Sequence, residues 1–226
     1  MFLLRPPGVY RPQGDTSMLA EAVEQIGIRP GARVLDVGTG TGAIAVLAAR
    51  TAVARVTAVD ISLRAVLAAR LNVWIHGLRQ VRVLRGDLFT PVEGEVFDVI
   101  LANPPYVIGK PGHPGKHSRD RAWDAGPDGR RVLDQICAQA PGHLAERGTL
   151  LIVQSALSGV QLTLSRLRES GMEPGVVASR PEPFGPVMRA RAALLEARGL
   201  IAPGQRHEEL VVIRADRTDA VVPLRA

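Results

Sequence analysis

The sequence is poor in cysteine, in lysine and in long apolar runs, and each shortage excludes a class of protein. Cys137 is the single cysteine, so neither an internal disulfide nor a thiolate metal cluster can form, as suits a reducing cytoplasm. No apolar run reaches the roughly 18 residues of a membrane span. Arg5, Pro6 and Pro7 stand where a signal peptide would carry its apolar stretch. We therefore expect a cytoplasmic protein without a membrane segment.

The length and the apolar content favour one folded domain. The chain has 226 residues, of which 46% are hydrophobic, enough to bury a sizeable core and to exclude a disordered chain. We expect a single domain over residues 1–214 that opens with a short N-terminal segment, residues 1–30. A C-terminal tail, residues 215–226, follows it.

The basic balance of the chain raises nucleic acid as a partner class. Lysine and arginine number 28 against 22 aspartates and glutamates, which gives a net charge of +6. Lys110 and Lys116 are the only lysines, so 26 of the basic residues are arginines, and most of these are dispersed along the sequence. The basic stretch from Lys110 to Arg121 is the part that would favour an RNA-like or acidic substrate surface.

Short apolar runs alternate with helical patterns along the chain. Strands are predicted over residues 33–37, 56–60, 81–85, 97–102, 149–154, 172–180 and 208–214. Helices are predicted over residues 43–51, 62–76, 130–144, 158–170 and 187–198. This alternation predicts an α/β fold with a parallel sheet and helices on both faces.

A glycine-rich turn follows the first predicted strand, with the sequence Asp-Val-Gly-Thr-Gly-Thr-Gly over residues 36–42. Glycines at the start of a helix permit a tight turn and the close approach of a ligand to the backbone. Nicotinamide, flavin and other adenosine-containing ligands all use such turns, so the turn alone does not identify the ligand.

Three carboxylates at successive strand ends narrow the choice of ligand. Asp60 ends the second strand, where it can accept hydrogen bonds from both ribose hydroxyls, and Asp87 follows the third strand within reach of an adenine amine. Asp36 could face a ligand ammonium, which a dinucleotide pyrophosphate does not offer. A single carboxylate at a strand end often only caps a helix. Because the carboxyl edge of an open α/β sheet binds ligands, we expect these three to surround one.

The fourth predicted strand runs directly into Asn103, Pro104, Pro105 and Tyr106. Two prolines leave few backbone conformers, so the loop is stiff and directs the Asn103 side-chain oxygen and the neighbouring carbonyls at one spot. These acceptors suit a planar NH2 group, on whose flat face Tyr106 can stack. The pattern favours alkylation of an amide or exocyclic amine nitrogen, held in line with a bound methyl donor.

The segment from residue 103 to residue 129 is long and rich in proline and glycine, as functional loops often are. His113 and His117 lie four apart in it, but Pro114 and Gly115 argue against a helical metal site, and no metal is expected. Cys137 is expected in the core. The arginines of residues 189–198 leave open a solvated helix face, which we favour, or a phosphate contact.

The pairing of Asp-x-Gly-x-Gly-x-Gly with Asn-Pro-Pro-Tyr resembles class I S-adenosylmethionine-dependent methyltransferases that act on nitrogen. Within them the sequence is similar to the HemK/PrmC group, which methylates the glutamine of the Gly-Gly-Gln motif in peptide-chain release factors. Residues 9–16 resemble the Tyr-x-Pro-x-x-Asp-Thr segment of the short archaeal and eukaryotic branch. Residues 123–130 resemble its Trp…Gly-x-Asp-Gly-Arg segment. The resemblance covers roughly residues 9–214.

This resemblance implies a Rossmann-like, mostly parallel sheet of seven strands whose last strand is antiparallel. It implies S-adenosylmethionine as cofactor, S-adenosylhomocysteine as product and a protein glutamine as methyl acceptor. It places Asn103, Pro104, Pro105 and Tyr106 around the substrate amide. Around the methyl donor it places Thr16, Asp36, Gly38, Gly40, Asp60, Asp87, Leu88 and Asn103.

The sequence also departs from the family in ways that bear on partners. The long bacterial form has an N-terminal helical domain that docks the release factor, and we expect none in this chain. The eukaryotic short form works with a small zinc-binding activator subunit, so such a partner stays open. Gln13 and Gly14 stand where the branch usually carries a larger and more acidic pair.

Two other functions remain as alternatives. An N6-adenine methyltransferase acting on DNA or RNA would use the Asn-Pro-Pro-Tyr loop equally well, but it would need a target-recognition domain that this sequence lacks. A non-catalytic module that only binds the donor would not need Asn103 and Tyr106. Nucleic acid is therefore the less favoured substrate, and a release factor the favoured one.

Overall fold

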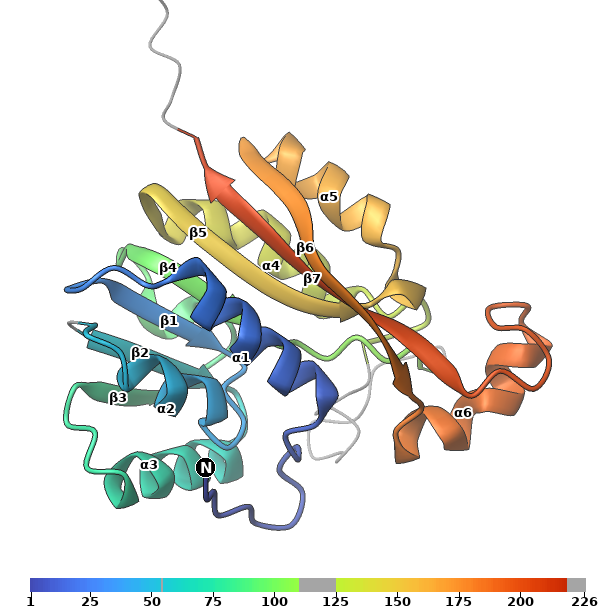
Figure 1. Cartoon of the computed structure of the whole chain (residues 1–226), viewed down its shortest axis with the longest axis horizontal. Coiled ribbons are helices and arrows are strands. Elements are labelled where there is room, and N and C mark those ends of the chain that lie inside the picture. The colour runs from blue at the N-terminus through green and yellow to red at the C-terminus, as the bar shows by residue number, and fades with distance from the viewer. Residues whose placement is uncertain (54, 110–124, 219–226) are drawn as a thin grey trace, which may run out of the picture.

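The computed structural model describes residues 1–53, 55–109 and 125–218, which form one seven-stranded sheet covered by helices (Figure 1). The strands are β1 Arg33–Val37, β2 Arg55–Asp60, β3 Val81–Arg85, β4 Phe97–Ala102, β5 Leu144–Ser155, β6 Met172–Pro183 and β7 His207–Arg217. The helices are α1 Gly14–Ile26, α2 Ala43–Ala49, α3 Leu63–Ile75, α4 Arg131–Gln139, α5 Val160–Glu169 and α6 Pro186–Ala197. Within these described residues, short 3-10 helices span Thr90–Val92, Ala140–His143 and Ala156–Ser158.

The strands are ordered β3-β2-β1-β4-β5-β7-β6 across the sheet. The pairs from β3 to β5 are parallel, and β7 runs antiparallel to both of its neighbours, β5 and β6. The predicted fold class, with a mostly parallel sheet and an antiparallel last strand, is thereby confirmed. Because β1 to β4 are parallel, the residues that follow each of them meet at one edge of the sheet.

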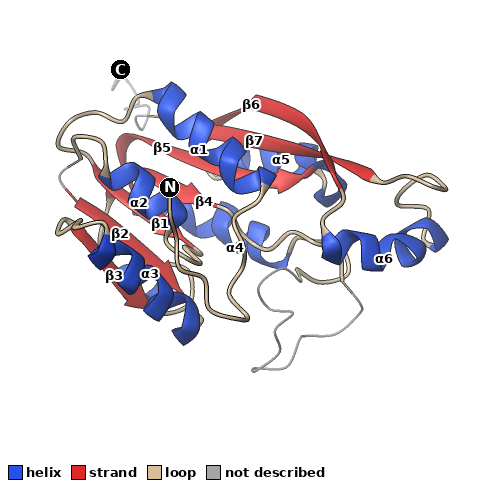
Figure 2. Ribbon diagram, turned by 60° about the horizontal axis from the view of Figure 1, so that its bottom comes forward, coloured by secondary structure: helices blue, strands red, loops and turns tan. Residues whose placement is uncertain are grey.

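Each face of the sheet buries its own apolar cluster. One cluster joins the sheet to α1, α2 and α3 through residues such as Leu19, Val46 and Val66. The other joins it to α4 and α5 through residues such as Ile136 and Leu167. Figure 2 shows these two groups of helices on opposite sides of the strands. Cys137 is buried in the second cluster, as expected, and burial raises the pKa of its thiol to about 11.

Several elements differ from the predicted ones, most of them by a few residues at an end, and three of the differences matter here. The helix α1 lies inside the N-terminal segment, for which the sequence predicts no helix. The helix predicted over residues 130–144 ends at Gln139, because Pro141 lies in a 3-10 helix that leads into β5 at Leu144. The last strand reaches Arg217 and buries Ala215, so the chain is still part of the sheet where residues 215–226 are expected to form a tail.

The strands β6 and β7 carry α6 between them and extend as an arm beyond the rest of the sheet (Figure 1). An apolar cluster fixes this arm to the loop after β4, and it contains Ile108, Phe184, Met188, Ala192, Leu195 and Ile201. Two arginines of the predicted basic helix also bind that loop. Arg191 donates to the carbonyl of Ile108 at 2.6 Å, and Arg198 donates to the carbonyl of Pro127 at 2.9 Å. These two side chains therefore serve the fold.

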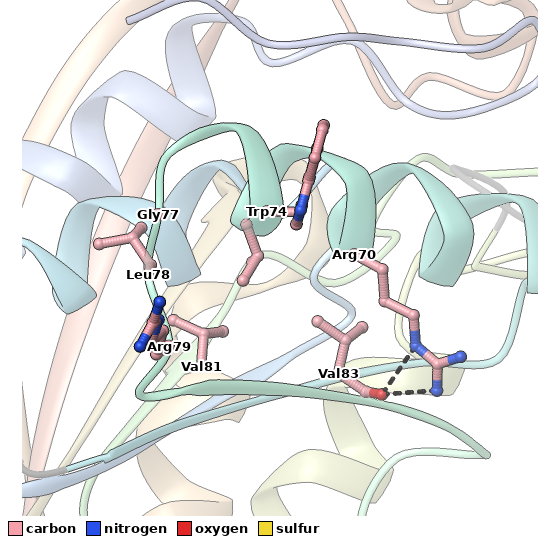
Figure 3. A pocket seen from close by; sticks show the side chains of 8 residues that line it. Arg70, Trp74, Gly77, Leu78, Arg79, Val81 and Val83 are labelled. Carbon is pink, nitrogen blue, oxygen red and sulfur yellow. Dashed lines mark hydrogen bonds between the residues drawn. The ribbon is translucent and has the colours of Figure 1, made fainter.

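A groove of about 500 Å³ lies between the C-terminal half of α3 and the amino end of β3, the outermost strand (Figure 3). Trp74 lines it and is 76% exposed, and Arg70 donates two hydrogen bonds to the carbonyl of Val83 within it. The groove lies at the opposite end of the strands from the predicted ligand site. No helix in the described part of the chain is long and apolar enough to cross a membrane.

Candidate active site

The glycine-rich turn links β1 to α2 and contacts the end of β2 on one side and α3 on the other. Gly38 and Thr39 donate to the carbonyl of Val59, at the end of β2, at 2.9 and 3.0 Å. Gly42 has a φ of +82°, and a Cβ on it would lie 3.2 Å from that of Ala69 on α3. A side chain at position 42 would therefore push the turn away from α3, which explains the third glycine of the motif.

Asp36 organises the interior of this turn. Its Oδ2 accepts from the Thr39 hydroxyl at 2.5 Å and from the backbone N–H of Ala45, in the first turn of α2, at 3.1 Å. Its Oδ1 accepts no hydrogen bond from the residues that the structure describes. Burial raises the pKa of Asp36 to about 7 despite these two bonds. Oδ1 is therefore available as an acceptor, and a nearby cation would stabilise the ionised carboxylate.

Asp60 and the turn after β3 lie next to the glycine-rich turn. Asp60 accepts from the backbone N–H groups of Gly40 at 2.9 Å and Ser62 at 2.8 Å, one on each oxygen, and burial raises its pKa. Each carboxylate oxygen can accept a second bond, so capacity for a hydroxyl remains. Asp87 is exposed, and Leu88, half-buried, has a φ of +44°. The three carboxylates therefore lie at or just beyond the carboxyl ends of three neighbouring strands.

The loop after β4 lies against the glycine-rich turn. A Cβ on Gly38 would lie 3.9 Å from the carbonyl oxygen of Asn103, so the two loops are neighbours. The side-chain amide of Asn103 donates to the hydroxyl of Thr16, in the first turn of α1, at 3.3 Å. Thr16 thus reaches the loop from an element that is distant in sequence. One of the two Nδ2 hydrogens is used by this bond, and Oδ1 accepts no hydrogen bond from the residues that the structure describes.

Asp15, which is not among the predicted site residues, accepts hydrogen bonds from three residues of this region. It is 3% exposed, and its Oδ2 accepts from the hydroxyls of Tyr10 at 2.7 Å and Tyr106 at 3.1 Å. Its Oδ1 accepts from the N–H of Thr16 at 2.5 Å and from the Thr16 hydroxyl at 3.1 Å. Burial and the charge of Asp15 raise the pKa of Tyr106 well above its usual value, so its hydroxyl keeps its proton.

Two acidic residues of the β6–β7 arm also lie beside Asp15. Glu182 and Glu208 are opposite each other in the antiparallel pair. The carboxylate of Glu182 takes the space beside Gly14, where a Cβ would lie 2.2 Å from its Oε1. Glu208 is 8% exposed, and its Oε2 has no hydrogen-bond partner among the described residues. Burial raises its pKa, as do the charges of Asp15 and Glu182.

These acidic residues explain why a small residue stands at position 14, and two of them, Asp15 and Glu208, were not predicted as site residues. The small residue at Gly14 leaves room for a carboxylate that comes from the arm. Asp15 could have been found from its place in the Tyr-x-Pro-x-x-Asp-Thr segment. Glu208 has no local signal, because only the packing of β7 against α1 brings it to the site.

The described part of the segment that resembles Trp…Gly-x-Asp-Gly-Arg, residues 125–130, packs against the loop that contains Asn103. Ala125 donates to the carbonyl of Val107 at 3.0 Å, and Gly109 donates to that of Gly126 at 2.7 Å. A Cβ on Gly129 would lie 2.5 Å from the carbonyl oxygen of Tyr106. Glycine is therefore needed at position 129 for the backbone of the two segments to meet.

Arg130 ends this segment as a buried clamp. Its guanidinium donates to Asp134 at 2.8 and 3.0 Å, to the hydroxyl of Thr163 at 3.1 Å and to the carbonyls of Ser158 and Gly159. Ser158 in turn donates to the carbonyl of Tyr106 at 2.9 Å. A chain of contacts thus runs from α4 to the loop after β4.

Some of the predicted features fall outside the described residues. These are His113, His117, Trp123, Asp124 and the basic stretch from Lys110 to Arg121. Among the residues that the structure describes, no group of three or more histidines, cysteines or acids is arranged to hold a metal ion.

The residues at the carboxyl edge fit a small cationic nucleoside. Asp36 offers a carboxylate oxygen for an ammonium, Asp60 offers acceptors for hydroxyls, and, apart from its chain neighbours, no described atom lies within 4 Å of the position of a Cβ on Gly40. Asn103 lies beside the glycine-rich turn, and Tyr106 follows it in the same loop, where Asp15 holds its hydroxyl. A sheet of this order with this edge defines a class I methyltransferase.

Comparisons with known proteins also indicate a methyltransferase. The family model of the methyltransferase small domain matches residues 4–119. The chain is 32% identical over 182 residues to a Methanocaldococcus jannaschii protein named "Putative protein N5-glutamine methyltransferase", covering 80% of this chain and 90% of that one. It is 37% identical over 172 residues to the release factor glutamine methyltransferase of Gloeobacter violaceus, covering 73% of this chain but only 60% of that enzyme.

A similar fold is found in the solved E. cuniculi Mtq2–Trm112 complex, which is responsible for methylating the termination factor eRF1. The TM-score is 0.65 at 23% identity, over 93% of this chain and 99% of that one. The chain belongs to the methyltransferase small domain family. It is an S-adenosylmethionine-dependent N-methyltransferase.

Proposed function

We propose that this enzyme methylates the side-chain amide nitrogen, N5, of a protein glutamine in the cytoplasm. The acceptor we propose is the glutamine of the Gly-Gly-Gln motif in a peptide-chain release factor. The observation that carries the proposal is the orientation of the Asn103 amide, which donates one N–H to Thr16 and whose Oδ1 accepts no hydrogen bond from the described residues. The names of the archaeal and Gloeobacter relatives support the same acceptor class.

The donor site would be formed by the turn and the strand ends. Asp36 would bind the ammonium of the donor, Asp60 its ribose hydroxyls, and the residues after β3, Asp87 and Leu88, its adenine. Gly38 and Gly40 would leave room for the donor, and Thr16 and Asn103 would border it. S-adenosylmethionine, when bound, supplies an electrophilic methyl group on its sulfonium sulfur.

The acceptor site would be formed by the stiff loop. The Oδ1 atom of Asn103 and the backbone carbonyls beside Pro104 and Pro105 would accept the two N–H groups of the glutamine amide. The ring of Tyr106, held by Asp15, would lie against the flat face of the amide. An amide nitrogen is a poor nucleophile because its lone pair is delocalised, so the loop acts first by positioning it.

The same acceptors then stabilise the change in charge. As the bond from nitrogen to the methyl carbon forms and the sulfur–carbon bond breaks, positive charge develops on the nitrogen. Hydrogen bonds to Asn103 strengthen in that state. S-adenosylhomocysteine is the leaving group, the nitrogen finally gives one of its two protons to solvent water, and a neutral N5-methylglutamine remains.

We include a release factor, and a small activator subunit, among the proposed partners. The first is supported by the Gloeobacter relative and the second by the Mtq2–Trm112 structure. Co-expression with a candidate activator and size-exclusion chromatography would test the second, since a stable partner would co-elute.

The decisive experiment is methyl transfer from labelled S-adenosylmethionine to a purified release factor. We expect label on the wild-type factor, on the Gly-Gly-Gln glutamine in mass spectrometry, and none on a factor with that glutamine changed to alanine. A parallel incubation with cell extract would show label on nucleic acid if the enzyme were an N6-adenine methyltransferase. Donor binding without transfer to any acceptor would indicate a non-catalytic module.

A further inference from the structure

Residues 2–9, which we term the strap, lie along α3 (Figure 1). At the C-terminal end of that helix, the carbonyl of Phe2 is hydrogen-bonded to His76 at 2.9 Å. At its N-terminal half, Val9 packs on Ala65 and Ala68. The strap then continues through Tyr10 into α1, so it connects α3 to the part of α1 that meets Asn103.

One buried side chain joins the strap to the glycine-rich turn. Asn72, on α3, is 1% exposed. Its Oδ1 accepts from the N–H of Leu4 at 2.8 Å, and its Nδ2 donates to the carbonyl of the same residue at 2.9 Å. The second hydrogen of Nδ2 is donated to the carbonyl of Thr41, between the last two glycines of the turn, at 2.9 Å.

The chemistry of this contact is demanding. A carboxamide is the side-chain group that can pair with both the N–H and the C=O of one residue and still donate elsewhere. Asparagine at this position therefore fixes the strap and the turn to each other, and not only to α3. The bond to Thr41 is buried, whereas Leu4 is 36% exposed and its two bonds are partly buried. Loss of the amide therefore leaves the carbonyl of Thr41 without this donor in the interior and releases the backbone of Leu4 from α3.

The two ends of this connection lie on either side of the donor site. The turn that contains Thr41 also contains Asp36 and Gly40, which would face the donor. The strap leads to Asp15 and Thr16, which hold the Asn103 loop. Movement of the strap away from α3 would loosen both sides.

We propose that Asn72 is a positioning residue for donor binding, which acts by tying the N-terminal strap to the glycine-rich turn. It touches neither substrate in this arrangement. Its effect reaches the donor through the backbone of Thr41 on one side and through the path from Leu4 to Thr16 on the other.

The test measures binding of S-adenosylhomocysteine by calorimetry, so its outcome does not depend on which molecule accepts the methyl group. Asn72→Ala removes all three hydrogen bonds. Removal of residues 1–5 deletes the strap side of the contact and keeps the bond from Asn72 to Thr41. Each change is expected to raise the Kd about 5- to 20-fold. The two together should raise it no further than the larger single effect, since both break one connection.

Trp74→Ala is the matched control, because Trp74 lies on the same helix but is 76% exposed and projects away from Val81 and Val83 (Figure 3). It should leave the Kd unchanged. If Asn72→Ala folds poorly, Asn72→Asp, which keeps Oδ1 but loses both donations, and the shortened chain carry the test.

The proposal is overturned by either of two results. In the first, Asn72→Ala lowers the melting temperature but leaves the Kd within twofold, which would make the residue purely structural. In the second, removal of residues 1–5 leaves the Kd unchanged, or its effect multiplies with that of Asn72→Ala, which would separate the strap from the turn.

Discussion

The hydroxyl of Tyr106 donates to the buried carboxylate of Asp15 at 3.1 Å, across 91 positions of sequence. The two residues come from the loop after β4 and from the first turn of α1. The same carboxylate holds Thr16, which accepts from Asn103. Both side chains of the proposed acceptor site therefore depend on one aspartate that need not touch a substrate.

Asp15→Ala should lower kcat about 10- to 100-fold, because the Tyr106 ring and the Asn103 amide lose their common anchor and small misplacements of reacting groups are costly. The affinity for S-adenosylhomocysteine should change less. Steady-state kinetics with the accepted substrate would measure the first and calorimetry the second. Glu21→Ala is the control, since Glu21 lies on the same helix and pairs only with Arg180 at the surface. An unchanged kcat in Asp15→Ala would contradict the anchoring role.

Donor affinity should depend on pH through Asp36, whose pKa burial raises to about 7. The donor ammonium prefers the ionised carboxylate, so affinity should be greatest above pH 7 and fall as the carboxyl gains a proton below it. The expected weakening from pH 8 to pH 6 is about tenfold for one such group. Calorimetric titration with S-adenosylhomocysteine at several pH values would measure it. Asp36→Asn should bind weakly and without this dependence, and a slope that persists in that variant would assign it to another group.

Gly129→Ala should destabilise the protein and slow the reaction. Its φ of +74° is unfavourable for alanine, and the new Cβ would lie 2.5 Å from the carbonyl oxygen of Tyr106. We expect a loss of about 2–4 kcal/mol in the free energy of unfolding, together with a lower kcat. Gly199→Ala separates the two causes, because Gly199 also has a positive φ, +65°, but open space around it. That control should cost only about 1 kcal/mol. Equal losses in the two variants would mean that the contact with Tyr106 is unimportant.

Arg130→Met should cost about 2–4 kcal/mol of unfolding free energy in urea titration, because it leaves two backbone carbonyls without this buried donor, while Asp134 keeps its ion pair with Arg166 at 3.3 Å. Arg206→Met removes the exposed pair with Glu196 instead and should cost less than about 1 kcal/mol. A loss of similar size in both would show that the clamp contributes no more than a surface ion pair.

Much of the sheet could be predicted because its strands are marked locally. β1, β3 and β4 have the predicted bounds. The helix α1 was within reach of the same reasoning, since Met18, Leu19, Ala22 and Val23 are spaced as a buried helical face. The early start of β5 was not, because residues 144–148 carry no strand pattern and pair in the sheet only through Leu144 and Phe97.

The sequence by itself determined the chemistry at each strand end: a glycine-rich turn with an aspartate before it, two further aspartates, and a stiff Asn-Pro-Pro-Tyr loop. Those features are encoded within a few residues, where backbone freedom and side-chain type are enough to infer them. Only the tertiary structure decided that Asp15, Asn72, Gly129 and Glu208 support them. Their partners lie tens of residues away, and proximity of that kind arises from the packing of α1, α3 and the arm against one sheet edge.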